Sequence, residues 1–216
     1  MEIRHIMHTA RSVTIEIADG GRYFTKQPIE LRLNGEPTLT TEKTITSLFD
    51  LKPDQKYVVE AYVNGEKQGE VSFKTDYEYV TLDVTRFGAK GDGEHDDTHF
   101  IQAAIMACPV NSRVYFPAGT YHITSLFLKS HIRIELAEGA ELKAFTDREK
   151  FPTFPGMLQS YDETDEYNLG TWEGNPLPMF SGIICGIGAE DVVIYGQGKT
   201  MEEETKALFD LVVETA

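Results

Sequence analysis

The first candidate for chemistry in this sequence is a pair of adjacent carboxylates, Asp96 and Asp97. Two such groups can share a proton or hold a metal ion. Asp92, Glu94 and Asp96 fit the first three ligand positions of a calcium loop, but the template needs Gly at Asp97 and Glu at Ala103. We therefore expect a turn and a helix cap here rather than a catalytic pair or a cation site.

Trp172 is the single tryptophan, and it stands in a Trp-Glu-Gly motif. Because aromatic faces stack on sugar rings, Trp172 is the candidate substrate-binding residue. The alternative is a loop anchor packed against the rest of the protein. The acidic run before it would repel an acidic polysaccharide, and we expect a solvated loop there. This run comprises Asp162, Glu163, Asp165 and Glu166.

The histidines and cysteines form no recognisable metal or nucleophile motif. His95 and His99 have the i, i+4 spacing of a metal pair, but we expect ordinary surface or strand histidines. Two cysteines, Cys108 and Cys185, are too few for a disulfide framework, so we expect small buried thiols. No Gly-x-Ser-x-Gly and no phosphate loop occurs, and we expect no cofactor and no metal. The six histidines are His5, His8, His95, His99, His122 and His131.

Charge and hydropathy narrow the range of partners. The 216 residues include 20 Lys and Arg against 35 Asp and Glu, a formal net charge of −15. This acidic balance argues against nucleic acid and anionic lipid as partners. The apolar runs are far shorter than a bilayer span, so we expect no membrane partner. The first eight residues contain no apolar leader segment, which favours a cytoplasmic over a secreted location.

The first eighty residues alternate apolar and polar side chains in short runs. Such alternation is typical of half-buried strands, and Asn-Gly between two runs is a strong hairpin signal. Asn-Gly occurs at 34–35 and at 64–65. We therefore expect a small antiparallel sandwich over residues 1–78. The alternating runs are 12–17, 29–33, 57–63 and 70–74.

Residues 48–57 have the form of a tyrosine corner, in which Tyr57 opens a strand and its hydroxyl turns back to the upstream backbone. With the closing Phe-Lys-Thr at 73–75, the segment from about residue 8 to 76 resembles a fibronectin type III domain. It contains no nucleophile–base pair and no ligand cluster. We expect a spacer or docking module beside a larger domain.

Residues 84–109 predict a bent, glycine-rich segment that leads into a helix. An aspartate at 96 or 97 can cap a helix from about Thr98 to Ala107, and Pro109 ends it. The glycines are Gly88, Gly91 and Gly93, and the expected apolar face comprises Phe100, Ile101, Ala104 and Ile105.

A repeat follows this helix. Short apolar runs begin at Val114, Ile134 and Val193, and each is followed at the same offset by a glycine, namely Gly119, Gly139 and Gly198. The first two glycines are 20 residues apart and the last two 59 apart, which predicts a long insertion between about 145 and 180. A strand–turn–strand unit at this period is typical of a parallel β-solenoid, in which stacking buries the apolar face of each coil. The helix at 98–107 is placed to cover the first end.

Several motifs in this order resemble the opening of a bacterial polygalacturonase, a pectin-degrading enzyme of glycoside hydrolase family 28. They are Phe-Gly-Ala-Lys-Gly-Asp-Gly-Glu-His-Asp-Asp-Thr at 87–98, Ile-Gln-Ala-Ala-Ile at 101–105, Val-Tyr-Phe-Pro-Ala-Gly-Thr-Tyr at 114–121 and Gly-Thr-Trp-Glu-Gly-Asn-Pro-Leu at 170–177. The resemblance spans about 82–198 and implies a right-handed parallel β-helix of the pectin lyase-like superfamily over 79–216. Bacterial exo-acting members also carry a fibronectin-like domain before the β-helix. The expected fold class is all-β.

The resemblance implies hydrolysis of α-1,4-galacturonide linkages with inversion, in which one carboxylic acid protonates the glycosidic oxygen and carboxylates activate water. The family places Asn-Thr-Asp, Asp-Asp, Gly-His-Gly and Arg-Ile-Lys motifs on later coils. This chain has no Asn-Thr-Asp and no Gly-His-Gly, and Arg133-Ile-Glu135 only approximates Arg-Ile-Lys. We assign no catalytic residue, expect the C-terminal catalytic part to be missing, and leave open whether this chain is an enzyme.

Residues 199–216 depart from the family pattern. Thr200 and Glu203 fit a capping box, and apolar residues at helical spacing predict a terminal helix at about 200–214. We expect it to cap the open end of a truncated β-helix, where an unpaired edge otherwise invites self-association. The alternative is an unrelated tail. The apolar face comprises Met201, Thr205, Leu208, Leu211 and Val212.

Two functions from different classes remain. The first is the N-terminal part of a polygalacturonase-like glycoside hydrolase, inactive alone, whose partner by resemblance is a pectic oligosaccharide or polygalacturonate. The second is a non-catalytic carbohydrate-binding or assembly module. A calcium-dependent pectate lyase shares the β-helix, but its calcium carboxylates and Arg base cannot be placed in this chain.

Overall fold

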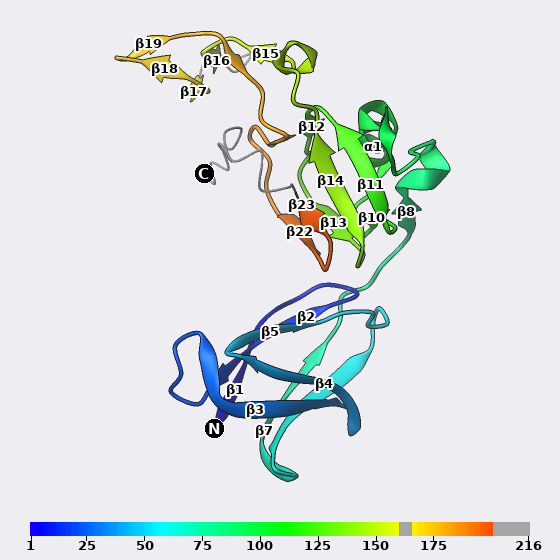
Figure 1. Cartoon of the computed structure of the whole chain (residues 1–216), viewed down its shortest axis with the longest axis vertical. Coiled ribbons are helices and arrows are strands. Elements are labelled where there is room, and N and C mark those ends of the chain that lie inside the picture. Colours follow the sequence, from blue (N-terminus) through cyan, green and yellow to red (C-terminus); the bar gives the residue numbers. More distant parts are fainter. Residues whose placement is uncertain (160–165, 201–216) are drawn as a thin grey trace. The chain divides into compact units, whose positions relative to one another are not determined.

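The structure is a computed structural model that describes residues 1–159 and 166–200. The chain divides into two compact units, Met1–Glu78 and Tyr79–Ala216 (Figure 1). The acidic residues Asp162, Glu163 and Asp165 lie outside the described residues. The terminal helix expected at about 200–214 also lies outside them, except for Thr200, which belongs to strand β23 (Lys199–Thr200). None of the helices described is long and apolar enough to span a bilayer.

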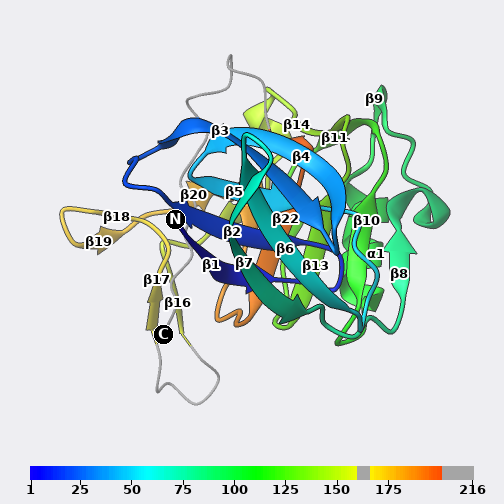
Figure 2. The same cartoon turned by 90° about the horizontal axis from the view of Figure 1, so that it is seen from below.

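The first unit is built from two antiparallel sheets (Figure 2). One sheet has the order β1-β2-β5 and the other β4-β3-β6-β7. Buried aliphatic side chains from both sheets, such as Ile15, Leu31 and Val59, form one core between them, so the unit is a sandwich. The strands are β1 (Glu2–His8), β2 (Val13–Ala18), β3 (Phe24–Leu33), β4 (Glu36–Lys43), β5 (Ile45–Leu48), β6 (Lys56–Val63) and β7 (Glu66–Lys74).

Both Asn-Gly pairs form the tight turns that the sequence predicts. All four residues have positive φ, from 50° to 85°, in the β3–β4 and β6–β7 hairpins. Strands β1, β4 and β5 were not among the predicted runs. Strand β4 shows why a strand can be missed. Seven of its eight residues are exposed, so its sequence does not alternate between apolar and polar side chains.

The Tyr57 hydroxyl accepts a hydrogen bond from the backbone N–H of Lys52 at 2.9 Å. This is the contact that defines a tyrosine corner. The contact and the strand order agree with a fibronectin type III-like sandwich, and that assignment stays a prediction.

The second unit is a parallel β-helix. Its strands stack in three parallel sheets with the orders β8-β10-β13-β22, β9-β11-β14-β23 and β12-β21. Each turn of the chain adds one strand to each of the first two sheets, and two of the turns also add one to the third sheet. The prediction of a solenoid is confirmed. The strands are β8 (Thr81–Asp83), β9 (Asp92–Asp96), β10 (Arg113–Phe116), β11 (Gly119–Ile123), β12 (Leu126–Phe127), β13 (Ile132–Leu136), β14 (Ala140–Ala144), β21 (Ile184–Cys185), β22 (Val192–Gly196) and β23 (Lys199–Thr200).

The register differs in detail from the glycine alignment. In the first sheet Val114 pairs with Ile134 and Ile134 with Ile194, so the second spacing is 60 residues rather than 59. In the second sheet Gly119 pairs with Ala140, one residue beyond Gly139. The corner between the two sheets contains two residues after Phe116 but three after Leu136, and this extra residue shifts the register.

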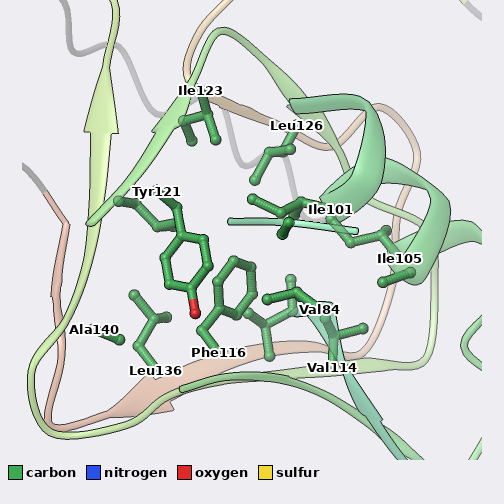
Figure 3. Packing of buried hydrophobic residues seen from close by; sticks show 14 of the residues in the cluster. Val84, Ile101, Ile105, Val114, Phe116, Tyr121, Ile123, Leu126, Leu136 and Ala140 are labelled. Carbon is green, nitrogen blue, oxygen red and sulfur yellow. The ribbon is translucent and has the colours of Figure 1, made fainter. Parts of the chain in front are cut away.

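Helix α1 (Thr98–Ala107) has the predicted bounds and lies over the first coil, where it follows the short helix η1 (Val84–Phe87). Its Ile101, Ala104 and Ile105 are fully buried in the core of the second unit (Figure 3). Phe100 does not belong to this face, since it is 41% exposed and its ring lies against Gly88 instead. The helix ends at Cys108, because a residue before proline favours extended backbone.

Two buried aromatic rings pack against each other in the core of the β-helix. Phe116 and Tyr121 meet edge to face with ring centroids 5.4 Å apart, and the Tyr121 hydroxyl donates to the Pro117 carbonyl at 2.9 Å. Figure 3 shows these rings between the side chains of α1 and those of the later coils. Burial therefore costs the phenol no hydrogen bond.

The insertion occupies the predicted place. After β14 the chain leaves the coil at Phe145 and returns at β21, which pairs with β12. The elements described between them are short, and their strands pair as two-stranded ribbons (Figure 1). They are η2 (Arg148–Lys150), β15 (Thr153–Phe154), β16 (Met157–Gln159), β17 (Glu166–Asn168), β18 (Thr171–Trp172), β19 (Asn175–Pro176) and β20 (Met179–Phe180).

Candidate functional site

Trp172 lies on an exposed hairpin of the insertion. Strands β18 and β19 pair Trp172 with Asn175, and the turn between them places Glu173 and Gly174 at positive φ. The indole is 68% exposed, so it buries too little surface to anchor the loop. An exposed, rigid aromatic face on a solenoid insertion can stack on a sugar ring.

An apolar hollow lies at the base of the insertion. It forms between β15, β17, β20 and the segment that follows β21, and it holds about 590 Å³, part of which is open to solvent. Phe180 and Ile187 are 45% and 39% exposed there. Apolar and aromatic walls with a few polar groups are typical of small-molecule sites. Side chains that line it include Phe154, Tyr167, Leu169, Met179, Phe180 and Ile187.

The amino-acid sequence does not predict this hollow, because the walls come from short segments without a periodic pattern of apolar residues. Trp172 is not among its lining residues. Cys185 is, but burial raises the pKa of its thiol, and its Sγ lies 3.2 Å from the Gly182 carbonyl. A thiol that stays protonated is a poor nucleophile. Neither cysteine forms a disulfide; Cys108 is buried as predicted, and Cys185 is only half-buried.

Asp96 and Asp97 accept hydrogen bonds from the backbone, as expected of a turn and a helix cap, but only one of them binds the start of the helix. Asp97 is fully buried, and its carboxylate accepts the backbone N–H groups of Lys90 and Gly91 at 2.6 and 2.9 Å. Its side chain makes no cap bond to the helix. Asp96 instead accepts the N–H of Thr98 at 3.0 Å. The pair therefore holds the glycine-rich loop on one side and the helix start on the other.

The nearest match to Arg-Ile-Lys is committed to ion pairs between coils. Arg133 donates to the Asp191 carboxylate at 2.8 Å, which together with His131 lowers the pKa of Asp191. Glu135, which is 5% exposed, accepts from Arg113 on the previous coil. Neither charge is placed to meet a galacturonate carboxylate.

Within the described residues 1–159 and 166–200, no group of three or more His, Cys, Asp or Glu is placed to hold an ion. His95 does not pair with His99. Its Nδ1 lies 2.7 Å from the Asp92 carboxylate. Asp92 also accepts the N–H groups of His95 and Glu94, which lower its pKa to about 2.

Comparisons with known proteins bear on this unit and on the whole chain. Residues 81–137 match the family of rhamnogalacturonase A and epimerases, which is described as pectate lyase-like. An exo-poly-alpha-D-galacturonosidase of Dickeya chrysanthemi is 39% identical over 71 residues, 33% of this chain and 12% of that protein. Plasmin and fibronectin-binding protein A of Streptococcus pneumoniae (strain ATCC BAA-255 / R6) is 37% identical over 172 residues, 78% of this chain and 21% of that protein.

Among solved structures, the family 28 exopolygalacturonase of Yersinia enterocolitica aligns with 92% of this chain and 40% of its own, with a TM-score of 0.58. At 20% identity this likeness shows the fold alone. The chain spans about one eighth of the Dickeya relative and about one fifth of the Streptococcus relative. What those proteins do as wholes thus depends mostly on residues beyond the matched parts.

Proposed function

We propose that this chain, whose second unit is a pectate lyase-like β-helix with polygalacturonase-like sequence, is the N-terminal part of a glycoside hydrolase that acts on pectic galacturonides. One observation carries the proposal. The motifs at 87–98, 101–105 and 114–121 occupy successive positions of one coil system, as loop, end-covering helix and stacked strand. Residues 81–137, which contain them, are the segment that the family description matches.

In this proposal the chain supplies scaffold and sugar contacts rather than the reacting groups. Inversion needs an acid and a base carboxylate roughly 6.5–9.5 Å apart, one on each side of the scissile bond. The 216 residues carry no Asn-Thr-Asp and no Gly-His-Gly motif. The adjacent Asp96 and Asp97 are occupied by backbone N–H groups. The chain alone is therefore inactive, and Trp172 offers a stacking face to the polysaccharide.

The test is release of reducing ends from polygalacturonate by the purified chain, with an active exopolygalacturonase as the positive control. No release above the buffer blank is expected. Measurable turnover that persists after further purification would overturn the inactivity. The DNA that follows the coding segment gives a second check, because the proposal expects it to encode the absent motifs in some frame.

A non-catalytic binding module is the second candidate, and one comparison favours it. The Streptococcus relative, whose name describes binding to plasmin and fibronectin, matches 78% of this chain, against 33% for the galacturonosidase. Titration with oligogalacturonates, followed by the fluorescence of the single Trp172, separates the two. Saturable binding without turnover favours the module. Weak quenching that does not saturate favours the enzyme fragment, which keeps the stacking face of Trp172 but lacks the Arg-Ile-Lys motif that would hold galacturonate carboxylates.

A further inference from the structure

The first strand carries two histidines that a backbone irregularity brings to one face. Strand β1 pairs with β2, and the register shifts between His5, opposite Ile15, and Met7, opposite Thr14. In a regular strand, residues three apart point to opposite faces, because side chains alternate with period two. A bulge inserts one residue and re-aims the side chains beyond it. His5 and His8 consequently share a face.

Their ring nitrogens converge. His5 Nε2 lies 2.8 Å from His8 Nδ1, with ring centroids 4.9 Å apart. Both rings lie 6.0 Å from the ring of Phe73, which gives them a common apolar wall. The other nitrogen of His8, Nε2, lies 3.4 Å from the carboxylate of Asp76.

This arrangement has the parts of a metal site with its outer shell. Two imidazole nitrogens bound to one tetrahedral Zn²⁺ at about 2.0–2.1 Å stand about 3.3 Å apart, so the rings need to open by about half an ångström. Metal-bound histidines commonly donate their second N–H to a carboxylate, which fixes the tautomer. Asp76 is placed for this role, since a proton on His8 Nε2 faces its carboxylate and leaves the Nδ1 lone pair pointing at His5. A metal ion would replace the contact between the two rings.

We propose that His5 and His8 bind a divalent transition-metal ion of the Zn²⁺ class, with Asp76 as the carboxylate that orients His8 and with water in the remaining positions. Nitrogen ligands favour Zn²⁺, Ni²⁺ and Cu²⁺ over Ca²⁺ and Mg²⁺. The site belongs to the sandwich unit and is separate from pectin chemistry. It joins two residues of β1, an edge strand of its sheet, to Asp76 just after β7.

The test is isothermal titration of the full chain, freed of metal, with ZnCl₂. One Zn²⁺ per chain is expected. His5→Ala and His8→Ala each weaken binding by at least roughly tenfold, and Asp76→Asn weakens it about 10–100-fold, the usual effect of removing an outer-shell partner. Thermal melts without metal should match wild type, since the substituted side chains are at most half-buried. If the alanine variants melt early, His5→Gln and His8→Gln replace them.

The chain offers matched controls. His131 and His95 each lie beside a carboxylate, Asp191 and Asp92, and neither has a second imidazole beside it of the kind that His5 has in His8. His131→Ala and His95→Ala are therefore expected to bind Zn²⁺ as wild type does. The proposal is overturned if wild type takes up no Zn²⁺, if His5→Ala binds as tightly as wild type, or if the control variants lose as much affinity as the site variants.

Discussion

The side-chain amide of Gln102 makes two hydrogen bonds to the backbone of Phe127. Its Nε2 donates to the Phe127 carbonyl at 2.9 Å, and its Oε1 accepts the Phe127 N–H at 2.7 Å. One helical turn earlier, Thr98 Oγ1 accepts the N–H of Thr124 at 2.9 Å. Helix α1 thus satisfies the edge of β12 much as a neighbouring strand would, and closes the β-helix against further pairing at that edge.

Gln102→Leu should destabilise the β-helix unit, because it leaves both backbone groups of Phe127 without these partners. We expect the free energy of unfolding to fall by about 1–3 kcal/mol. Urea unfolding followed by circular dichroism measures it. His99→Ala, on the exposed side of the same helix, should stay within about 0.5 kcal/mol of wild type. Equal effects of the two substitutions would contradict the strand-like role.

Asp97→Asn replaces a carboxylate that accepts two backbone N–H groups with an amide that has a single acceptor oxygen. Because bonds to a charged group contribute more than neutral ones, we expect a loss of about 1–3 kcal/mol. Asp96→Asn is the matched control, since asparagine also accepts at a helix start, and little change is expected. Chemical denaturation of the wild type and the two variants measures the free energy of unfolding. If Asp97→Asn lowers it no more than Asp96→Asn does, the loop does not depend on the charge of Asp97.

The pKa of Asp92 should be about 2, well below the ordinary aspartate value of 3.8, because its carboxylate accepts the backbone N–H groups of His95 and Glu94. A lowered pKa in the folded state means that the stabilising contribution is complete above the unfolded pKa. It is lost as the pH falls from about 3.8 through about 2.

Carboxyl ¹³C shifts followed by NMR measure the Asp92 midpoint directly. His95→Ala should leave the midpoint low, since the backbone donors outweigh the imidazole among the causes of the shift. A midpoint near 3.8 in the wild-type chain would contradict the loop geometry.

Ile194 should promote self-association through the last described coil. It continues a row in which Val114 and Ile134 are 0% and 3% exposed, yet it is itself 39% exposed. Ile194→Ser should therefore shift the protein towards monomer, while Ile45→Ser, at a comparably exposed position on the sandwich, should not. Sedimentation velocity at several concentrations provides the measurement. A wild-type chain that stays monomeric at every concentration would rule out self-association through this coil.

Some features were readable from local pattern alone. The bounds of helix α1, the two Asn-Gly hairpins and the corner contact of Tyr57 all follow from signals within about ten residues, and the structure places each as expected. The 20-residue repeat also predicted stacked coils, because apolar rows that recur at a coil's length can be buried only by their neighbours.

Details of the stacking were not readable in this way. One extra residue at a corner displaced Gly139 from the partner of Gly119, and the side of α1 that carries Phe100 turned to Gly88 rather than to the core. The register at Gly119 and the orientation of Phe100 both depend on the exact path of the backbone, which the types of the residues involved do not reveal.

The amino-acid sequence by itself determined the strand-rich first unit, the solenoid and the position of the insertion, since burial periods and turn residues act over short distances. Tertiary structure alone decided that Gln102 would pair with Phe127, that the insertion would wall a hollow, and that a bulge would join His5 to His8. Each of these needs groups from separate segments, or a shift of register, to meet within a few ångströms. These contacts are set by the packing of the whole unit and correspond to no periodic pattern in the sequence.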